Sequence, residues 1–292
     1  MANPRWLEKA ARFQEALGRV GPQPLDVHSY TNKRFTLNFR APVEELQRLL
    51  PDEIRAEEVP GTGLGMLGQC ACDFWVPRIG PLRIPAVRNN DMLLRISVTC
   101  RQGGKLLRGF YTLHSVSSSR LLATLGGRFS HFRKLRARFE RVDDEHTYAL
   151  ASRSSRPLSC GRIEARKASL TYTAPAGSLF ADSGAARDFL FQLDGSCGYQ
   201  WSSKRLSFQT IEYPEWDISF CHDVHWELPL VEAVAREFEL RLEYDSTVYM
   251  HDTPQVWGAT RLFRADGSDS WRPARTPQSS PDSPQRRSAP TS

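Results

Sequence analysis

Residues 91 to 100, with the sequence DMLLRISVTC, combine strict alternation with side chains that could do chemistry. On an extended strand, Asp91, Arg95, Ser97 and Thr99 share one face, and the other face is apolar. One interpretation is a sheet with one buried face and one wet face. The other is that the polar face lines the inside of a small barrel, where a ligand pocket would lie. The sequence leaves both interpretations open.

A second segment with candidate residues spans positions 131 to 135 and reads HFRKL. If this segment is a regular strand, His131 and Arg133 face inward and Lys134 faces outward with other charged side chains. Arg133 cannot supply a free amine, because a guanidinium with a pKa above ~12 keeps its proton. A β-bulge near Arg133 would reverse the facing of Lys134.

The cysteines and histidines do not predict a metal centre. Cys221, His222 and His225 are close in sequence, but their spacing matches no established zinc signature and no second ligand pair is evident. On a strand, His222 and His225 would face opposite ways. None of the six cysteines forms a C-x-x-C pair, so we expect reduced, mostly buried thiols. We expect no metal and no other cofactor.

The basic composition gives only weak support for nucleic-acid binding. Residues 261 to 292 hold six arginines against three aspartates, which is half of the formal net charge of +6. Only six of the 39 basic residues are lysines, a bias that is more typical of codon usage than of a dedicated phosphate-binding surface. We therefore expect no nucleic-acid partner.

Hydropathy predicts a cytoplasmic protein with one folded domain. No apolar run approaches the ~20 residues of a membrane-spanning helix, and charges interrupt residues 1 to 13 where a signal peptide would be apolar. We expect no membrane partner. Residues 1–265 are predicted to form a single domain that begins with an amphipathic helix. Residues 266–292 are rich in Ser, Pro and Arg and are predicted to be a disordered tail, since they cannot offset the entropy of ordering.

The pattern of the folded part is mostly that of β-strands. Helices are predicted over residues 42–50, 119–125 and 180–191, where apolar residues recur at helical spacing. Strands are predicted over residues 30–38, 65–76, 92–100, 106–115, 135–141, 147–151, 162–173, 205–213 and 238–249. Many short strands with few helices predict a β-rich α+β fold with a closed or sandwiched antiparallel sheet.

Several motifs together resemble a known family. They are NDMLLR at 90–95, FYTLHSVSSSR at 110–120, GGRFSHFRKL at 126–135, APAGSLF at 174–180 and YPEW at 213–216. This set resembles the domain of unknown function 2071, a family similar to the acetoacetate decarboxylase-like superfamily, over roughly residues 34 to 258. The resemblance implies an antiparallel closed β-barrel with a central pocket and a few flanking helices.

The resemblance also implies roles for individual residues. Acetoacetate decarboxylases use two adjacent lysines, one as the Schiff-base amine and one as the cation that lowers its pKa. Arg133 stands at the position of the first lysine and Lys134 at that of the second, which argues against a Schiff-base decarboxylase. Asp91 matches the acid of the superfamily's pocket. His114 stands where the family of unknown function often carries an acid.

These arguments give a candidate site and two classes of function. The candidate catalytic residues are Asp91, His114, Arg133 and Lys134, and the candidate ligand-binding residues are Arg95 and His131. They could form a cluster that binds a carboxylate and moves a proton, or they could simply satisfy one another by hydrogen bonds. We expect a pocket for a small organic acid, either with lyase-like or proton-transfer activity on a keto acid or as a non-catalytic ligand-binding or interaction protein. Whether the chain forms homo-oligomers is left open.

Overall fold

A computed structural model describes residues 25–102, 104–129, 134–200, 204–214 and 216–264 of the 292-residue chain. The predicted N-terminal helix and the predicted tail lie outside these residues. No helix among the described residues is long and apolar enough to cross a membrane.

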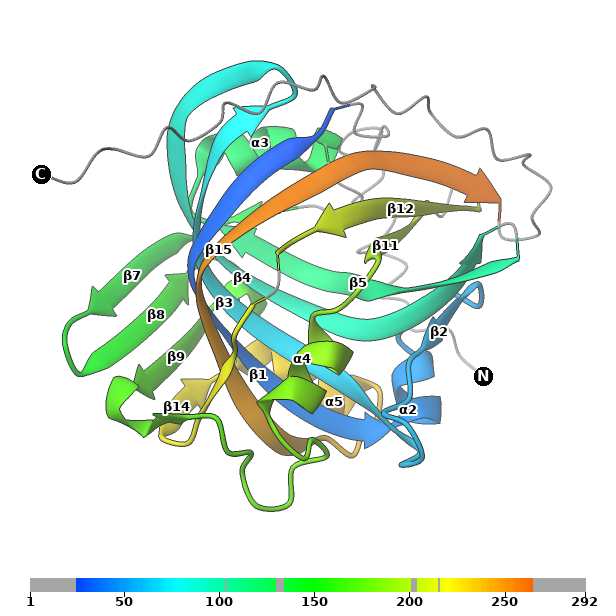
Figure 1. Cartoon of the computed structure of the whole chain (residues 1–292), viewed down its shortest axis with the longest axis vertical. Coiled ribbons are helices and arrows are strands. Elements are labelled where there is room, and N and C mark those ends of the chain that lie inside the picture. Colours follow the sequence, from blue (N-terminus) through cyan, green and yellow to red (C-terminus); the bar gives the residue numbers. More distant parts are fainter. Residues whose placement is uncertain (1–24, 103, 130–133, 201–203, 215, 265–292) are drawn as a thin grey trace, which may run out of the picture.

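Most of the strands belong to one large, strongly curved sheet (Figure 1). Hydrogen-bonded neighbours follow the order β1-β3-β4-β5-β11-β12-β15-β13-β10, with β2 paired to β4 and β6 paired to β5. β15 also pairs with β1, so the path of pairing returns to its first strand. The strands of this sheet are β1 (Val27–Pro42), β2 (Ile54–Ala56), β3 (Leu64–Ile79), β4 (Leu82–Gln102), β5 (Lys105–Ser117), β6 (Leu135–Arg136), β10 (Leu170–Thr171), β11 (Gly195–Gln200), β12 (Arg205–Glu212), β13 (Ser219–Cys221) and β15 (Glu243–Arg264).

A second sheet and a few helices complete the described fold. The second sheet has the order β14-β9-β8-β7, with β7 (Arg138–Asp143), β8 (Thr147–Arg153), β9 (Gly161–Arg166) and β14 (Val224–Glu227). The α-helices are α2 (Val43–Gln47), α3 (Arg120–Phe129), α4 (Ser183–Leu190) and α5 (Pro229–Glu237). Two short 3-10 helices, η1 (Pro157–Ser159) and η2 (Lys167–Ser169), join strands. The prediction of a mostly β fold with few helices is confirmed.

The predicted antiparallel arrangement is wrong, because the large sheet is mixed. β6 and β11 both run parallel to β5. Parallel neighbours need a crossover connection, and α3 supplies one between β5 and β6. The sequence pattern also missed α5, whose first turn carries Pro229, and placed a strand start at residue 238 where β15 begins only at Glu243.

The two faces of the large sheet differ in chemistry. On β4, one face carries Met92, Leu94 and Ile96, which are all buried in the main hydrophobic core with residues of the second sheet; we call it the Met92 face. The opposite face carries Asp91 and Arg95, and we call it the Asp91 face. The predicted apolar face of residues 92–100 is therefore confirmed, and on the polar face Asp91, Arg95 and Ser97 are buried as well.

The Asp91 face looks across the curved sheet toward other strands. Phe110 on β5 lies on this face, and its ring centroid is 6.3 Å from that of Trp257 on β15, although β11 and β12 separate these strands in the sheet. Phe191, just after α4, and Trp216 pack near the same side. The polar side chains of β4 therefore point into the interior of the fold.

Candidate functional site

Asp91 is a buried carboxylate held in a fixed position. It is 1% exposed and lies in register between Cys72 on β3 and Ser117 on β5. Asn89 Nδ2 donates a hydrogen bond to Asp91 Oδ1 at 2.5 Å. Asn89 Oδ1 in turn accepts from Ser117 Oγ and from the backbone N–H of Ser119, both at 2.8 Å. These bonds fix the amide so that its donor faces Asp91.

Lys134 forms an ion pair with this carboxylate. Its Nζ donates to Asp91 Oδ2 and lies 5.5 Å from the ring centroid of Phe74, and only 13% of its side chain is exposed. Lys134 therefore does not face outward, as a regular strand over residues 131–135 would require. Lys134 immediately precedes β6, which begins at Leu135, so strand alternation does not apply to it. Asp91 and Lys134 compensate each other's charge in a buried setting where either alone would be costly.

Arg34 lies in the same row of the sheet. It pairs in register with Cys72, and Cys72 pairs with Asp91, so three neighbouring strands place these residues side by side. Arg34 Nε donates to Cys72 Sγ at 3.2 Å. Burial raises the pKa of Cys72 to about 11, so the thiol is neutral at neutral pH and cannot balance the guanidinium charge. Arg34 has no carboxylate partner within the described part of the chain.

Arg95 lies four residues farther along β4 and is 7% exposed. Its guanidinium carbon is 4.9 Å from the ring centroid of Phe110 and 5.3 Å from that of Phe191. A Cβ at Gly68, its register partner on β3, would lie 3.6 Å from Arg95 Nε and 3.3 Å from a methyl of Thr36, so glycine leaves room for the arginine. Its only hydrogen bond to a described residue runs from Nη2 to Leu190 O at 3.5 Å.

A pocket of about 300 Å³ lies beside Phe191, and Arg95 itself does not line it. Its lining includes Phe191, whose ring stacks near the Arg95 guanidinium, together with Arg187, Gln192, Tyr213, Pro214 and Trp216. Burial raises the pKa of Tyr213, while the charges of Arg95 and Arg34 act in the opposite direction. The Tyr213 hydroxyl itself donates a hydrogen bond to Leu193 O at 3.2 Å.

Two hydroxyls on the Asp91 face have no hydrogen-bond partner among the described residues. Ser115 Oγ and Thr112 Oγ1 are both buried, and their residues pair in register with Leu93 and Arg95. Buried polar atoms normally have a partner, supplied by protein, water or ligand. Among the described residues, the interior therefore holds hydroxyl groups without a hydrogen-bond partner on the same face as Arg34 and Arg95, which have no carboxylate partner.

His114 lies on the other face of the sheet and does not meet Asp91. β5 has an irregularity at Leu113: His114 pairs with Leu94, while Thr112 pairs with Arg95. His114 therefore points to the Met92 face, where its Nε2 lies 3.2 Å from Ser159 Oγ beside a water-sized cavity of about 20 Å³. Burial, with a smaller effect of Arg156, lowers the pKa of His114 to about 4. The expectation that His114 joins Asp91 in one cluster is wrong.

Two of the predicted candidates, His131 and Arg133, lie outside the described residues. No group of three or more metal-ligating side chains occurs in the part of the chain that the structure describes. Cys221 is buried and contacts Ser169 Oγ at 3.2 Å, and His222 Nε2 is 3.1 Å from the carbonyl oxygen of Thr173.

The sequence analysis missed Arg34 and Tyr213. A signal for Arg34 was present, since Arg34, Thr36 and Asn38 share one face of a strand whose other face is apolar. Tyr213 gave no such signal, because it follows β12 and reaches the site only through the fold.

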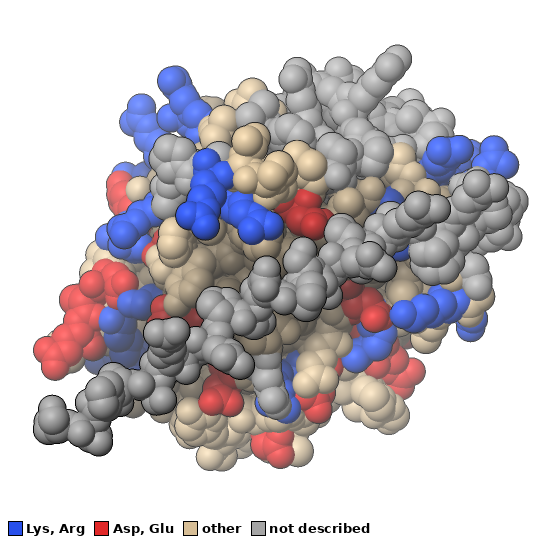
Figure 2. Space-filling view, turned by 45° about the horizontal axis from the view of Figure 1, so that its top comes forward, with Lys and Arg blue, Asp and Glu red and all other residues tan. Residues whose placement is uncertain are grey.

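The surface carries charges of both signs. On the face drawn in Figure 2, Lys and Arg side chains intermingle with Asp and Glu side chains over the described residues. This face has a mixed potential rather than a continuous basic one.

The fold is similar to that of acetoacetate decarboxylase-like proteins. An acetoacetate decarboxylase from Legionella pneumophila matches with a TM-score of 0.55 at 10% identity, over 84% of this chain and 88% of that chain. An acetoacetate decarboxylase-like enzyme from Sphingomonas wittichii RW1 matches with a TM-score of 0.53 at 14% identity, over 84% and 95%. The enduracididine biosynthesis enzyme MppR, solved with pyruvate, matches with a TM-score of 0.53 at 11% identity, over 83% and 91%.

Sequence comparison adds no relative to this structural likeness. No family model matches the chain, and no curated protein is significantly similar to it in sequence. The structural likeness shows the fold, and the resemblance to the domain of unknown function 2071 stays a prediction.

Proposed function

We propose that this protein binds a small keto acid inside a barrel formed by the ring of paired strands, and that Lys134 is the group that meets its carbonyl. The observation that carries this proposal is the buried Asp91–Lys134 pair, set one strand away from the Arg34–Cys72 contact. The fold supports it, since one protein of similar fold was solved with pyruvate.

Arg34 is suited to hold the carboxylate of such a ligand. Its planar guanidinium matches a carboxylate in two parallel hydrogen bonds, and its charge has no acidic partner among the described side chains. If a ligand carboxylate binds Arg34, the adjacent carbonyl carbon would lie along this row of the sheet, toward Asp91.

Lys134 can act on that carbonyl in two ways. As an ammonium it donates a hydrogen bond to the carbonyl oxygen and stabilises an enolate, while the Asp91 carboxylate accepts the proton lost from carbon. As an amine, after its proton passes to Asp91, it attacks the carbonyl carbon, a C–N bond forms, and the oxygen leaves as water to give a Schiff base. Because the Lys134 nitrogen is engaged by Asp91, the proposal is proton transfer rather than Schiff-base decarboxylation.

Borohydride trapping and isotope exchange separate these roles. Pyruvate is incubated with the full-length protein, with and without sodium borohydride, and the tryptic peptide of Lys134 is examined by mass spectrometry. In parallel, exchange of the pyruvate methyl protons for deuterium is followed by NMR. We expect protein-dependent exchange, lost in Asp91→Asn, with little or no reduced adduct. Lys134→Arg keeps the charge and serves as the control that cannot form an imine.

A non-catalytic binding protein is the second candidate, and one observation favours it. Asp91 and Lys134 already satisfy each other as an ion pair, an arrangement that a purely structural pair would also show. Pyruvate binding without exchange and without an adduct would assign the protein to this class. No binding of pyruvate or of a longer keto acid would contradict both candidates.

A further inference from the structure

Asn89 is a buried amide whose two ends face different partners. It is 1% exposed and lies on the same face of β4 as Asp91, two residues away. Its Nδ2 donates to Asp91 Oδ1 at 2.5 Å. Its Oδ1 accepts from the segment that joins β5 to α3, namely from Ser117 Oγ at 2.8 Å, Ser118 Oγ at 3.1 Å and the backbone N–H of Ser119 at 2.8 Å. Asn89 therefore links the carboxylate of Asp91 to that segment.

The amide of Asn89 has only one possible orientation. The backbone N–H of Ser119 can only donate, so the amide atom that it contacts is the oxygen. An ionised carboxylate can only accept, so the amide atom that contacts Asp91 is the nitrogen. Asn89 thus occupies Oδ1 of Asp91, and Lys134 contacts the other oxygen, Oδ2. Because a carboxylate that is bound at one oxygen cannot rotate freely, Asn89 sets the direction of Oδ2.

The segment that Asn89 holds is the start of the crossover that carries Lys134. This crossover runs from the end of β5 through α3 to β6, and Lys134 directly precedes β6. After β6, the backbone N–H of Ala137 donates to Ser117 O at 3.0 Å. The start and the end of the crossover therefore meet at Ser117, whose hydroxyl donates to Asn89. The position of Lys134 relative to Asp91 depends on this junction.

We propose that Asn89 is a positioning residue of this site, which holds Asp91 and the crossover of Lys134 in the geometry that proton transfer requires. This inference rests on the proposed keto-acid function and adds a residue that acts through Asp91 rather than on the ligand. In that reaction Lys134 meets the carbonyl oxygen while Asp91 takes a proton from the adjacent carbon, so both groups must be directed at one molecule. A misplacement of about 1 Å in such an arrangement costs about a hundredfold in rate.

The variant Asn89→Asp tests this role, because it changes only one end of the side chain. Aspartate has nearly the same shape and keeps an oxygen toward Ser117 and Ser119, but in its ionised form it has no donor for Asp91. Exchange of the pyruvate methyl protons is measured at pH 8 with the full-length variant over a range of pyruvate concentrations. We expect kcat to fall about tenfold to a hundredfold, and KM to stay within about threefold of the unaltered protein, since Arg34 still holds the carboxylate.

A second measurement does not depend on any reaction. In isotope-labelled protein, NMR scalar coupling across the hydrogen bond between Lys134 Nζ and the carboxylate carbon of Asp91 reports their contact directly. The unaltered protein without ligand should show this coupling, and Asn89→Asp should weaken or abolish it. A change that affected folding but left the pair intact would not move this signal.

Matched variants separate positioning from a general loss of structure. Asn32→Asp makes the same substitution at another amide that donates to a carboxylate, Asp73 Oδ2 at 3.3 Å, and should leave kcat and KM unchanged. Asp73 neighbours Cys72 on β3 and therefore lies on the opposite face of the sheet from Asp91. Ser118→Ala removes one donor to Asn89 and should lower kcat about twofold to fivefold. A thermal melt shows whether each variant is folded.

The outcomes separate this inference from the proposed function. Folded Asn89→Asp with kcat within about threefold of the unaltered protein overturns the positioning role, as does an equal loss in Asn32→Asp. A rise in KM at unchanged kcat also overturns it, because Asn89 would then serve ligand binding. If the unaltered protein catalyses no exchange, the keto-acid function fails. In that case, loss of the Lys134–Asp91 coupling in Asn89→Asp still supports the positioning role, and a coupling that persists overturns it.

Discussion

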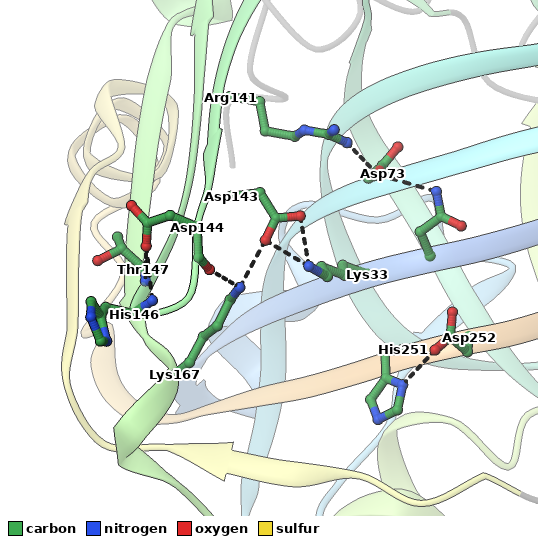
Figure 3. A network of polar contacts seen from close by, with 11 residues as sticks. Lys33, Asp73, Arg141, Asp143, Asp144, His146, Thr147, Lys167, His251 and Asp252 are labelled. Carbon is green, nitrogen blue, oxygen red and sulfur yellow. Dashed lines mark hydrogen bonds and ion pairs between the residues drawn. The ribbon is translucent and has the colours of Figure 1, made fainter.

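Two clusters of charged side chains in this molecule use the same residue types in different surroundings. Near the surface, Asp143 accepts hydrogen bonds from Lys33 at 2.6 Å and from Lys167 at 2.9 Å (Figure 3). In the interior, Asp91 pairs with Lys134, and Arg34 and Arg95 lie nearby. The Lys33, Asp143 and Lys167 side chains are 20–27% exposed, whereas Asp91 is 1% exposed.

The two clusters differ in how well water can screen their charges. The surface network joins the end of β7 to β1, and water screens any charge it leaves over. The interior cluster has little solvent to screen it, so a charge there without a counter-charge is costly. The surface network joins the second sheet to the large sheet, whereas the interior cluster is where we propose that a ligand binds.

The largest expected effect is at Lys134. Replacing it by methionine leaves Asp91 buried without its counter-charge, which should lower the free energy of unfolding by roughly 3–5 kcal/mol. Urea unfolding at pH 7 measures this.

The double variant Asp91→Asn with Lys134→Met is the control. It removes both charges and should recover most of the lost stability, since an uncharged pair has no ionic desolvation cost. If Lys134→Met alone costs less than about 1 kcal/mol, the interior pair behaves like the surface network and the comparison fails.

An intermediate effect on stability is expected at His114, whose buried imidazole is uncharged in the folded protein at neutral pH. Its pKa is lowered from 6.5 to about 4, first by burial. Between these pH values the unfolded chain binds a proton that the folded protein does not, so stability falls as pH falls. The full loss, reached below pH 4, is roughly 3 kcal/mol.

The variant His114→Gln isolates this contribution, because glutamine does not titrate and can still contact Ser159. Between pH 7 and pH 5, urea unfolding should show the original protein losing about 2 kcal/mol more than the variant. Parallel pH dependence in both proteins would mean that His114 is solvated and takes up its proton in the folded state.

The sequence predicted the position of Asp91 and Arg95 but not their neighbours. Alternation over residues 91–100 is a local property, and the structure confirms the apolar face and buries the polar one. The sequence misjudged the facing of Lys134 and the location of His114 for the same physical reason. Each depends on where regular pairing stops, at the start of β6 for Lys134 and at the irregularity beside Leu113 for His114.

Those interruptions are set by partners that are distant in sequence. β6 pairs with β5, and β5 pairs with β4, so the facing of Lys134 follows from three strands and a crossover helix. Arg34 could have been found, since it stands on the polar face of an alternating strand. What the sequence lacked was the register that places it beside Cys72 and Asp91.

The smallest expected effect on the free energy of unfolding is at the surface network of Lys33, Asp143 and Lys167. Burial alone would raise the pKa of Asp143, but hydrogen bonds from Lys33 and Lys167 lower it, so the carboxylate stays charged at neutral pH. Lys33→Met should cost at most about 1 kcal/mol at low salt, because Lys167 still pairs with Asp143 and water solvates the rest. The cost should shrink further in 1 M sodium chloride, where the screening length is about 3 Å. A salt-insensitive loss as large as that at Lys134 would show that exposure does not distinguish the two clusters.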